Sequence, residues 1–182
     1  MHRISLAAAL VAVASLPFAS RPRVASGSVS DTRAIWSNVS GYVTQSAEDM
    51  SDADYAFRPT PEVRTFGQLI AHIAGSQHLM CAAALGEPGG SEDDIEKTKT
   101  TKADLVAALK ASNEYCKRAY AQTDDQVAGM TKLFGQDHTR FYALVLNATH
   151  DNEHYGNIVT YMRLKGLVPP SSEAPAPAPK KP

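Results

Sequence analysis

Apolar residues recur every three or four positions along four separate stretches of the 182-residue chain. This spacing is typical of α-helices that bury one face, and no stretch shows the strict alternation of apolar and polar residues that predicts a half-buried strand. We therefore expect an all-α fold, a four-helix bundle. The four helices are predicted at 31–50, 65–85, 102–122 and 139–166.

The two ends of the chain differ in composition from the part between them. Residues 1–26 contain Arg3, an apolar run and then small residues up to Ser26, which is the layout of a secretory signal peptide. The apolar run is shorter than the roughly 20 residues of a membrane span, so we expect export to a periplasmic or extracellular space, with an uncleaved signal anchor as the alternative. Residues 173–182 are rich in proline and alanine and predict a disordered tail. One domain, residues 27–172, lies between these ends.

Charge and hydropathy exclude some classes of partner. The formal net charge is −1, and the lysines and arginines are scattered rather than clustered, which disfavours nucleic acid as a partner. No later segment approaches the length of a stable membrane span. The sequence leaves a homodimer and a small-molecule substrate open.

Two histidines stand four residues apart in the last predicted helix. Residues at this spacing differ by about 40° in direction, so His150 and His154 project from one face and can hold one metal ion. His72, in the apolar second helix, can supply a third imidazole. Asn147 and Asn157 share the direction of His150 together with apolar residues, so we expect the site to be buried, with these asparagines supporting the ligands.

The heights of the histidines along their helices predict how the helices run. His72 lies about 7 residues from the start of its helix and about 13 from its end, whereas His150 lies about 11 from the start of its own, at 1.5 Å per residue. The heights match best if the two helices are antiparallel. This favours an up-down-down-up order with a long crossover through 86–101 between helices two and three.

The two cysteines agree independently with this order. Cys81 and Cys116 lie about 15 and 14 residues into the second and third helices, so a parallel pair of helices brings them to equal height. Export permits disulfides. We therefore expect a Cys81–Cys116 disulfide, with two buried thiols as the alternative.

Two segments carry a family resemblance: PEVRTFGQLIAHIAG around His72 and HDNEHYGNIVTYMRLKG around His150 and His154. With the spacing between them, the chain resembles the DinB/YfiT-like superfamily over roughly residues 31–172. The resemblance implies a four-helix bundle in which the three histidines bind a divalent metal that keeps open positions for water. Asn157 stands where many relatives carry glutamine, a longer side chain. Characterised relatives include thiol-dependent S-transferases and isomerases, so the resemblance is specific for fold and metal site and not for reaction.

A divalent ion held by three imidazoles keeps at least one free position, where water becomes acidic enough to act as a nucleophile near neutral pH. We therefore expect a metal-dependent hydrolase or transferase acting on a small substrate. Glu153 is the candidate catalytic base, and zinc, nickel or iron suits the imidazole ligands. The alternative is a non-catalytic interaction bundle in which the metal acts as a staple, that is, a structural ion that only stabilises the fold. An enzyme needs an open pocket of about 300 Å³ or more beside the metal, whereas a structural metal needs none.

The same segment contains a competing motif. His150, Glu153 and His154 fit the HxxEH pattern of inverted zinc peptidases. Resemblance to these peptidases predicts a third, acidic ligand well downstream of the histidine pair. Only Glu173 follows here, in the predicted tail, so the peptidase interpretation lacks its ligand helix.

Export also disfavours a thiol-dependent reaction, because low-molecular-weight thiols are chiefly cytosolic.

Overall fold

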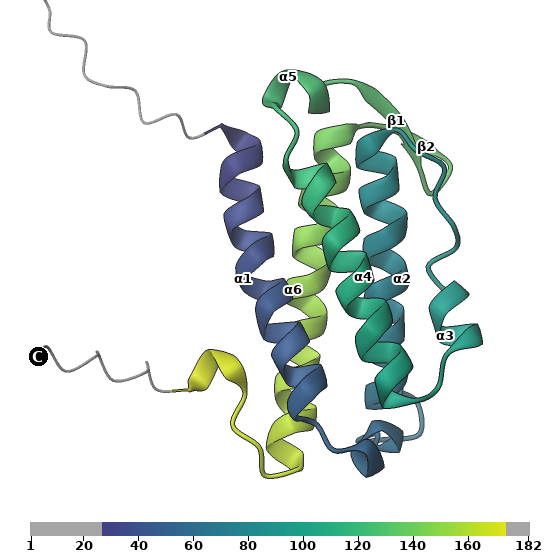
Figure 1. Ribbon diagram of the computed structural model, residues 1–182, viewed down its shortest axis with the longest axis vertical. Helices are drawn as coiled ribbons and strands as arrows, with labels where there is room; N and C mark the ends of the chain where they lie inside the picture. Colours follow the sequence, from purple (N-terminus) through teal and green to yellow (C-terminus); the bar gives the residue numbers. More distant parts are fainter. Residues whose placement is uncertain (1–26, 174–182) are drawn as a thin grey trace, which may run out of the picture.

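A computed structural model describes residues 27–173. The predicted signal peptide and all but the first residue of the predicted tail lie outside these residues. Four long helices pack side by side (Figure 1), which confirms the expected all-α four-helix bundle. They are α1 (Ser28–Asp49), α2 (Phe66–Leu85), α4 (Lys102–Tyr120) and α6 (Arg140–Leu164).

Short elements connect the long helices. They are η1 (Asp52–Ala56), α3 (Asp94–Thr98), α5 (Asp124–Val127), the strands β1 (Met130–Leu133) and β2 (Gln136–Thr139), and η2 (Pro170–Ser172). The expectation that no stretch forms a strand was wrong for β1 and β2, and the sequence did not predict α3 in the connection through 86–101. Each strand has only four residues and is mostly exposed, too short for alternation to show. The antiparallel hairpin turns at Phe134 and Gly135, both with positive φ (50° and 77°), as its two-residue turn requires.

Contacts between the long helices set their directions. The hydroxyl of Tyr161, near the end of α6, donates a 2.6 Å hydrogen bond to the backbone carbonyl of Arg64, just before α2. These two helices are therefore antiparallel. Helices α2 and α4 run parallel (Figure 1), and Cys81 and Cys116, at similar distances from the starts of these helices, form the expected disulfide. The connection between α2 and α4 carries α3 and passes beside α2 (Figure 1).

The bundle interior contains two apolar clusters with a polar layer between them. One cluster surrounds Phe66, Leu105 and Ile158, and the other surrounds Trp36 and the disulfide. Each of α2, α4 and α6 buries polar residues near the point where it passes from one cluster to the other. They are His72, Ser76, Gln77, Ser112, Asn147 and Asp151. This polar layer crosses the middle of the bundle at the level of the predicted site.

Not every apolar residue at helical spacing is buried. On α1, Ile35 is 56% exposed although its neighbour Trp36 is buried, because the buried face of this helix is narrower than its run of apolar residues. Within residues 27–173, no helix combines the length and the hydropathy needed to cross a membrane.

Candidate metal centre

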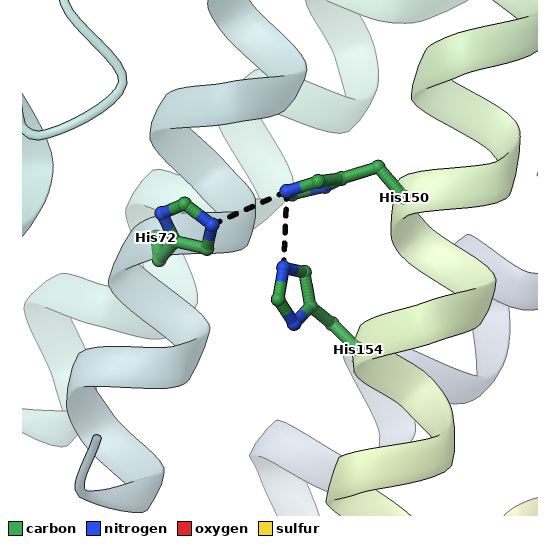
Figure 2. A group of neighbouring side chains, drawn as sticks. All are labelled: His72, His150 and His154. Atoms are coloured by element: carbon green, nitrogen blue, oxygen red, sulfur yellow. Dashed lines mark hydrogen bonds between the residues drawn. The ribbon is translucent and has the colours of Figure 1, made fainter. Parts of the chain in front are cut away.

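Three histidines from two antiparallel helices meet at one point. His72 projects from α2, and His150 and His154 project from successive turns of α6 (Figure 2). The Nε2 atom of His150 lies 3.2 Å from that of His72 and 3.0 Å from that of His154. One ring nitrogen from each of the three lies within 4.8 Å of the others. The structure thus brings together all three residues that the sequence singled out as metal ligands.

Local sequence signals fix where each of these helices begins. Thr65 and Gln68 form a reciprocal capping box at the start of α2. The hydroxyl of Thr139 accepts a hydrogen bond from the backbone of Tyr142 and caps α6. Because both starts are fixed, the height of each histidine along the bundle follows from its position in the sequence.

The donor set fits a divalent metal. Tetrahedral coordination at about 2.0–2.1 Å separates ligand nitrogens by about 3.3 Å, close to the 3.2 Å and 3.0 Å from Nε2 of His150 to those of His72 and His154. Among the described residues, the buried Nδ1 atoms of His72, His150 and His154 find no hydrogen-bond partner. A metal bound at Nε2 places the ring proton on Nδ1, so the orientation of the rings is the one that ligation requires.

Burial keeps the three imidazoles neutral. It is the main cause that lowers the pKa of His72 to about 4, and the Arg64 guanidinium acts in the same direction. Burial likewise lowers the pKa of His154 to about 4 and lowers that of His150. Near neutral pH the rings are therefore in the unprotonated form that binds metal.

The site lies at the edge of the bundle interior, which corrects one expectation. His72 is buried, but His150 and His154 are only partly so, and Asn157 is exposed. The buried face of α6 is centred on Asp151 instead, about 100° around the helix from His150. The two histidines point from the margin of that face into the space between α2 and α6.

The remaining candidates take different places. Asn147 is buried but donates its hydrogen bond to the hydroxyl of Tyr120, at 3.1 Å, and Asn157 lines a cleft beside His154. Glu153 is exposed, and its negative charge raises the pKa values of His150 and His154, against the effect of burial. Its catalytic role stays a prediction.

A cleft of about 480 Å³ opens beside His154. One wall is the segment before α2 and the start of that helix, and the other is the second half of α6. The lining includes Arg64, Leu69, His154, Asn157, Thr160 and Tyr161. The cleft therefore reaches the histidine cluster at His154.

Two residues near the site were not singled out from the sequence. Arg64 lies in the segment that carries the family resemblance, and its Nε atom pairs with Glu96 at 3.1 Å. Asp151 directly follows His150 and is fully buried; burial raises its pKa well above the usual range, and the nearby indole N–H of Trp36 opposes the rise in part. A signal was available for Asp151, since Ala148, Tyr155 and Ile158 flank it at helical spacing.

Comparisons with known proteins agree with this fold. A model of the DinB superfamily matches residues 36–158. The uncharacterized protein YjoA of Bacillus subtilis is 28% identical over 124 residues, covering 66% of this chain and 79% of YjoA. The crystal structure of a DinB-like protein from Bacillus cereus superposes with a TM-score of 0.66 at 18% identity, over 76% of this chain and 93% of that one. YfiT of Bacillus subtilis, described as a probable metal-dependent hydrolase with an unusual four-helix bundle topology, gives 0.60 at 18% identity, over 76% and 88%.

Proposed function

This chain belongs to the DinB superfamily, and we propose that it is an exported metal-dependent hydrolase or transferase that acts on a small molecule. The observation that carries the proposal is the convergence of His72, His150 and His154 beside an open cleft of about 480 Å³. The description of YfiT as a probable metal-dependent hydrolase supports it from the same fold. Zinc, nickel or iron, held by three imidazoles, supplies a Lewis acid and lowers the pKa of water at an open position.

Two side chains near the histidine cluster are assigned roles toward the substrate. Arg64 engages Glu96 through its Nε atom, which leaves the outer edge of the guanidinium for a carboxylate or phosphate group of the substrate. Glu153, next to His154 in the sequence and exposed, is the proposed proton acceptor. The substrate is therefore expected to be a small molecule that carries an anionic group.

The alternative, a bundle that binds metal only as a staple, predicts a closed site without space for a ligand. His154 instead forms part of the wall of the open cleft, whose volume exceeds the roughly 300 Å³ of small ligand pockets. The cleft favours the enzyme over the staple.

Export remains part of the proposal. Its basis is the signal-like composition of residues 1–26. The Cys81–Cys116 disulfide supports it, because disulfides persist in oxidising compartments and are rare in the cytosol. An oxidising compartment also favours hydrolysis or transfer without a thiol cosubstrate.

The proposal is tested by activity measurements on the chain after chelation and after reconstitution with zinc, nickel or iron. The substrates are small esters, amides and phosphoesters with and without a carboxylate. We expect turnover of at least one class by the reconstituted protein only, with loss in His154→Ala. His78→Ala is the matched control, because His78 lies exposed on α2 and packs against the ring of Tyr115, away from the cluster. Turnover that survives both chelation and His154→Ala contradicts the proposal.

A further inference from the structure

Asp151 is a buried carboxylate whose presence the packing of the bundle does not explain. The residue is 0% exposed and lies at the centre of the buried face of α6. Within residues 27–173, neither of its carboxylate oxygens has a hydrogen-bond partner. An unpaired buried carboxylate destabilises a fold, and an apolar side chain of similar volume would suit a bundle interior better.

The polar groups around Asp151 are engaged with other partners. The indole N–H of Trp36 lies near the carboxylate and partly opposes the rise of its pKa, but its hydrogen bond goes to the side-chain oxygen of Gln77, at 3.1 Å. The side-chain amide of Asn147 donates to the hydroxyl of Tyr120. These hydrogen bonds leave Asp151 as an acceptor without a donor in the polar layer.

A second unpaired atom faces this carboxylate. The Nδ1 atom of His150 is buried without a partner among the described residues and lies 3.9 Å from Oδ1 of Asp151. The Nε2 atom of the same ring points the other way, toward His72 and His154. An approach of about 1 Å brings the pair to hydrogen-bond distance.

A divalent ion makes these two unpaired atoms complementary. Ligation through Nε2 places the proton of His150 on Nδ1, which then needs an acceptor. The three neutral imidazoles contribute no negative charge, so a partly buried ion also needs a nearby anion. The positive charge of the ion in turn favours the ionised carboxylate.

We propose that Asp151 is a positioning residue for the metal site: its carboxylate accepts the Nδ1 proton of His150, fixes the orientation of that ring and offsets part of the charge of the ion. The inference rests on the metal binding in the proposed function. It assigns Asp151 no direct bond to the metal. It also explains why the middle of α6 has a carboxylate where packing alone calls for an apolar residue.

The test measures zinc affinity and the melting temperature of the metal-free protein in two variants. Asp151→Asn keeps an acceptor oxygen and the size of the side chain but removes the charge, and Asp151→Leu removes both. We expect zinc affinity to fall by about 10–100-fold in Asp151→Leu, as for other residues that support metal ligands, and by less in Asp151→Asn. The metal-free variants should melt at the same temperature as the wild type or higher, because the unpaired carboxylate is gone.

Each outcome decides between roles. Asp125→Asn, which removes an exposed carboxylate, is the control for net charge and should bind zinc like the wild type. Unchanged zinc affinity in both Asp151 variants overturns the inference and leaves the proposed function intact, whether or not the stability of the metal-free protein falls. A wild-type protein that binds no zinc overturns both. If Asp151→Leu does not fold, the isosteric Asp151→Asn variant decides the question.

Discussion

The backbone carbonyl of Glu92 lies against the Cα of Gly75, with no room for a side chain between them. Gly75 is on α2, three residues after His72, and Glu92 is on the connection that crosses to α4. The side chain of Glu92 also accepts a hydrogen bond from the hydroxyl of Ser76 at 3.4 Å. The crossover is therefore held against α2 beside the metal centre.

This contact predicts opposite effects for two glycine substitutions in helices. Gly75→Ala should destabilise the protein, because the new methyl group overlaps backbone that cannot rotate away. Gly41→Ala on α1, where nothing lies within 4 Å of the new atom, should stabilise it by about 0.5–1 kcal/mol through helix propensity. Urea unfolding of both variants measures the difference. Equal stabilisation by the two alanines is incompatible with the observed packing.

The disulfide should contribute substantially to stability. Cys81 and Cys116 are 35 residues apart in sequence and both fully buried, and a loop of this size predicts a loss of about 2–4 kcal/mol when the bond is removed. We expect Cys81→Ala/Cys116→Ala to unfold at lower urea concentration than the oxidised wild type. Reducing agent should lower the urea midpoint of the wild type to near that of the variant and leave the midpoint of the variant unchanged. A wild type whose urea midpoint does not change on reduction contradicts the prediction.

Acid should destabilise the metal-free protein. In the folded state the pKa values of His72 and His154 are about 4, below the ordinary 6.5, so between these values the unfolded chain binds more protons and stability rises with pH. Asp151 acts oppositely, since its raised pKa retains a proton in the folded state, but it is one group against three histidines. The free energy of unfolding, measured in chelator from pH 7 to pH 4, should therefore fall. His72→Leu should show a shallower fall, and a wild type that gains stability toward pH 4 would argue against neutral buried imidazoles.

Helical spacing and capping residues were enough to predict the parts of the fold that hold the site. The start of α2 at Phe66 follows from Thr65 and Gln68, whose reciprocal bonds are a local property of the sequence. The meeting of His72 with His150 and His154 follows from their heights on two long helices, because each residue advances by a fixed rise. The disulfide between Cys81 and Cys116 was predicted by the same reasoning.

Other features depend on contacts that spacing does not report. The sequence predicts a buried face of α6 centred on His150, whereas in the structure this face is centred on Asp151. Polar and apolar residues are spread around this helix, so the packing of α1 and α2 decides which side is covered. Asn157 and Leu164 are exposed for this reason. The β1–β2 hairpin depends on a two-residue turn at Phe134 and Gly135 in which a phenylalanine adopts positive φ, a conformation that residue type alone does not predict.

Metal content measured with matched histidine variants tests the central claim most directly. Wild type and His78→Ala, loaded with zinc and dialysed, should retain about one ion per chain, because His78 lies outside the cluster. His72→Ala, His150→Ala and His154→Ala should each lose the ion while keeping the helical circular dichroism spectrum of the wild type. If the single variants His72→Ala and His150→Ala both retain one equivalent of zinc, the result would contradict a metal site formed where α2 and α6 meet.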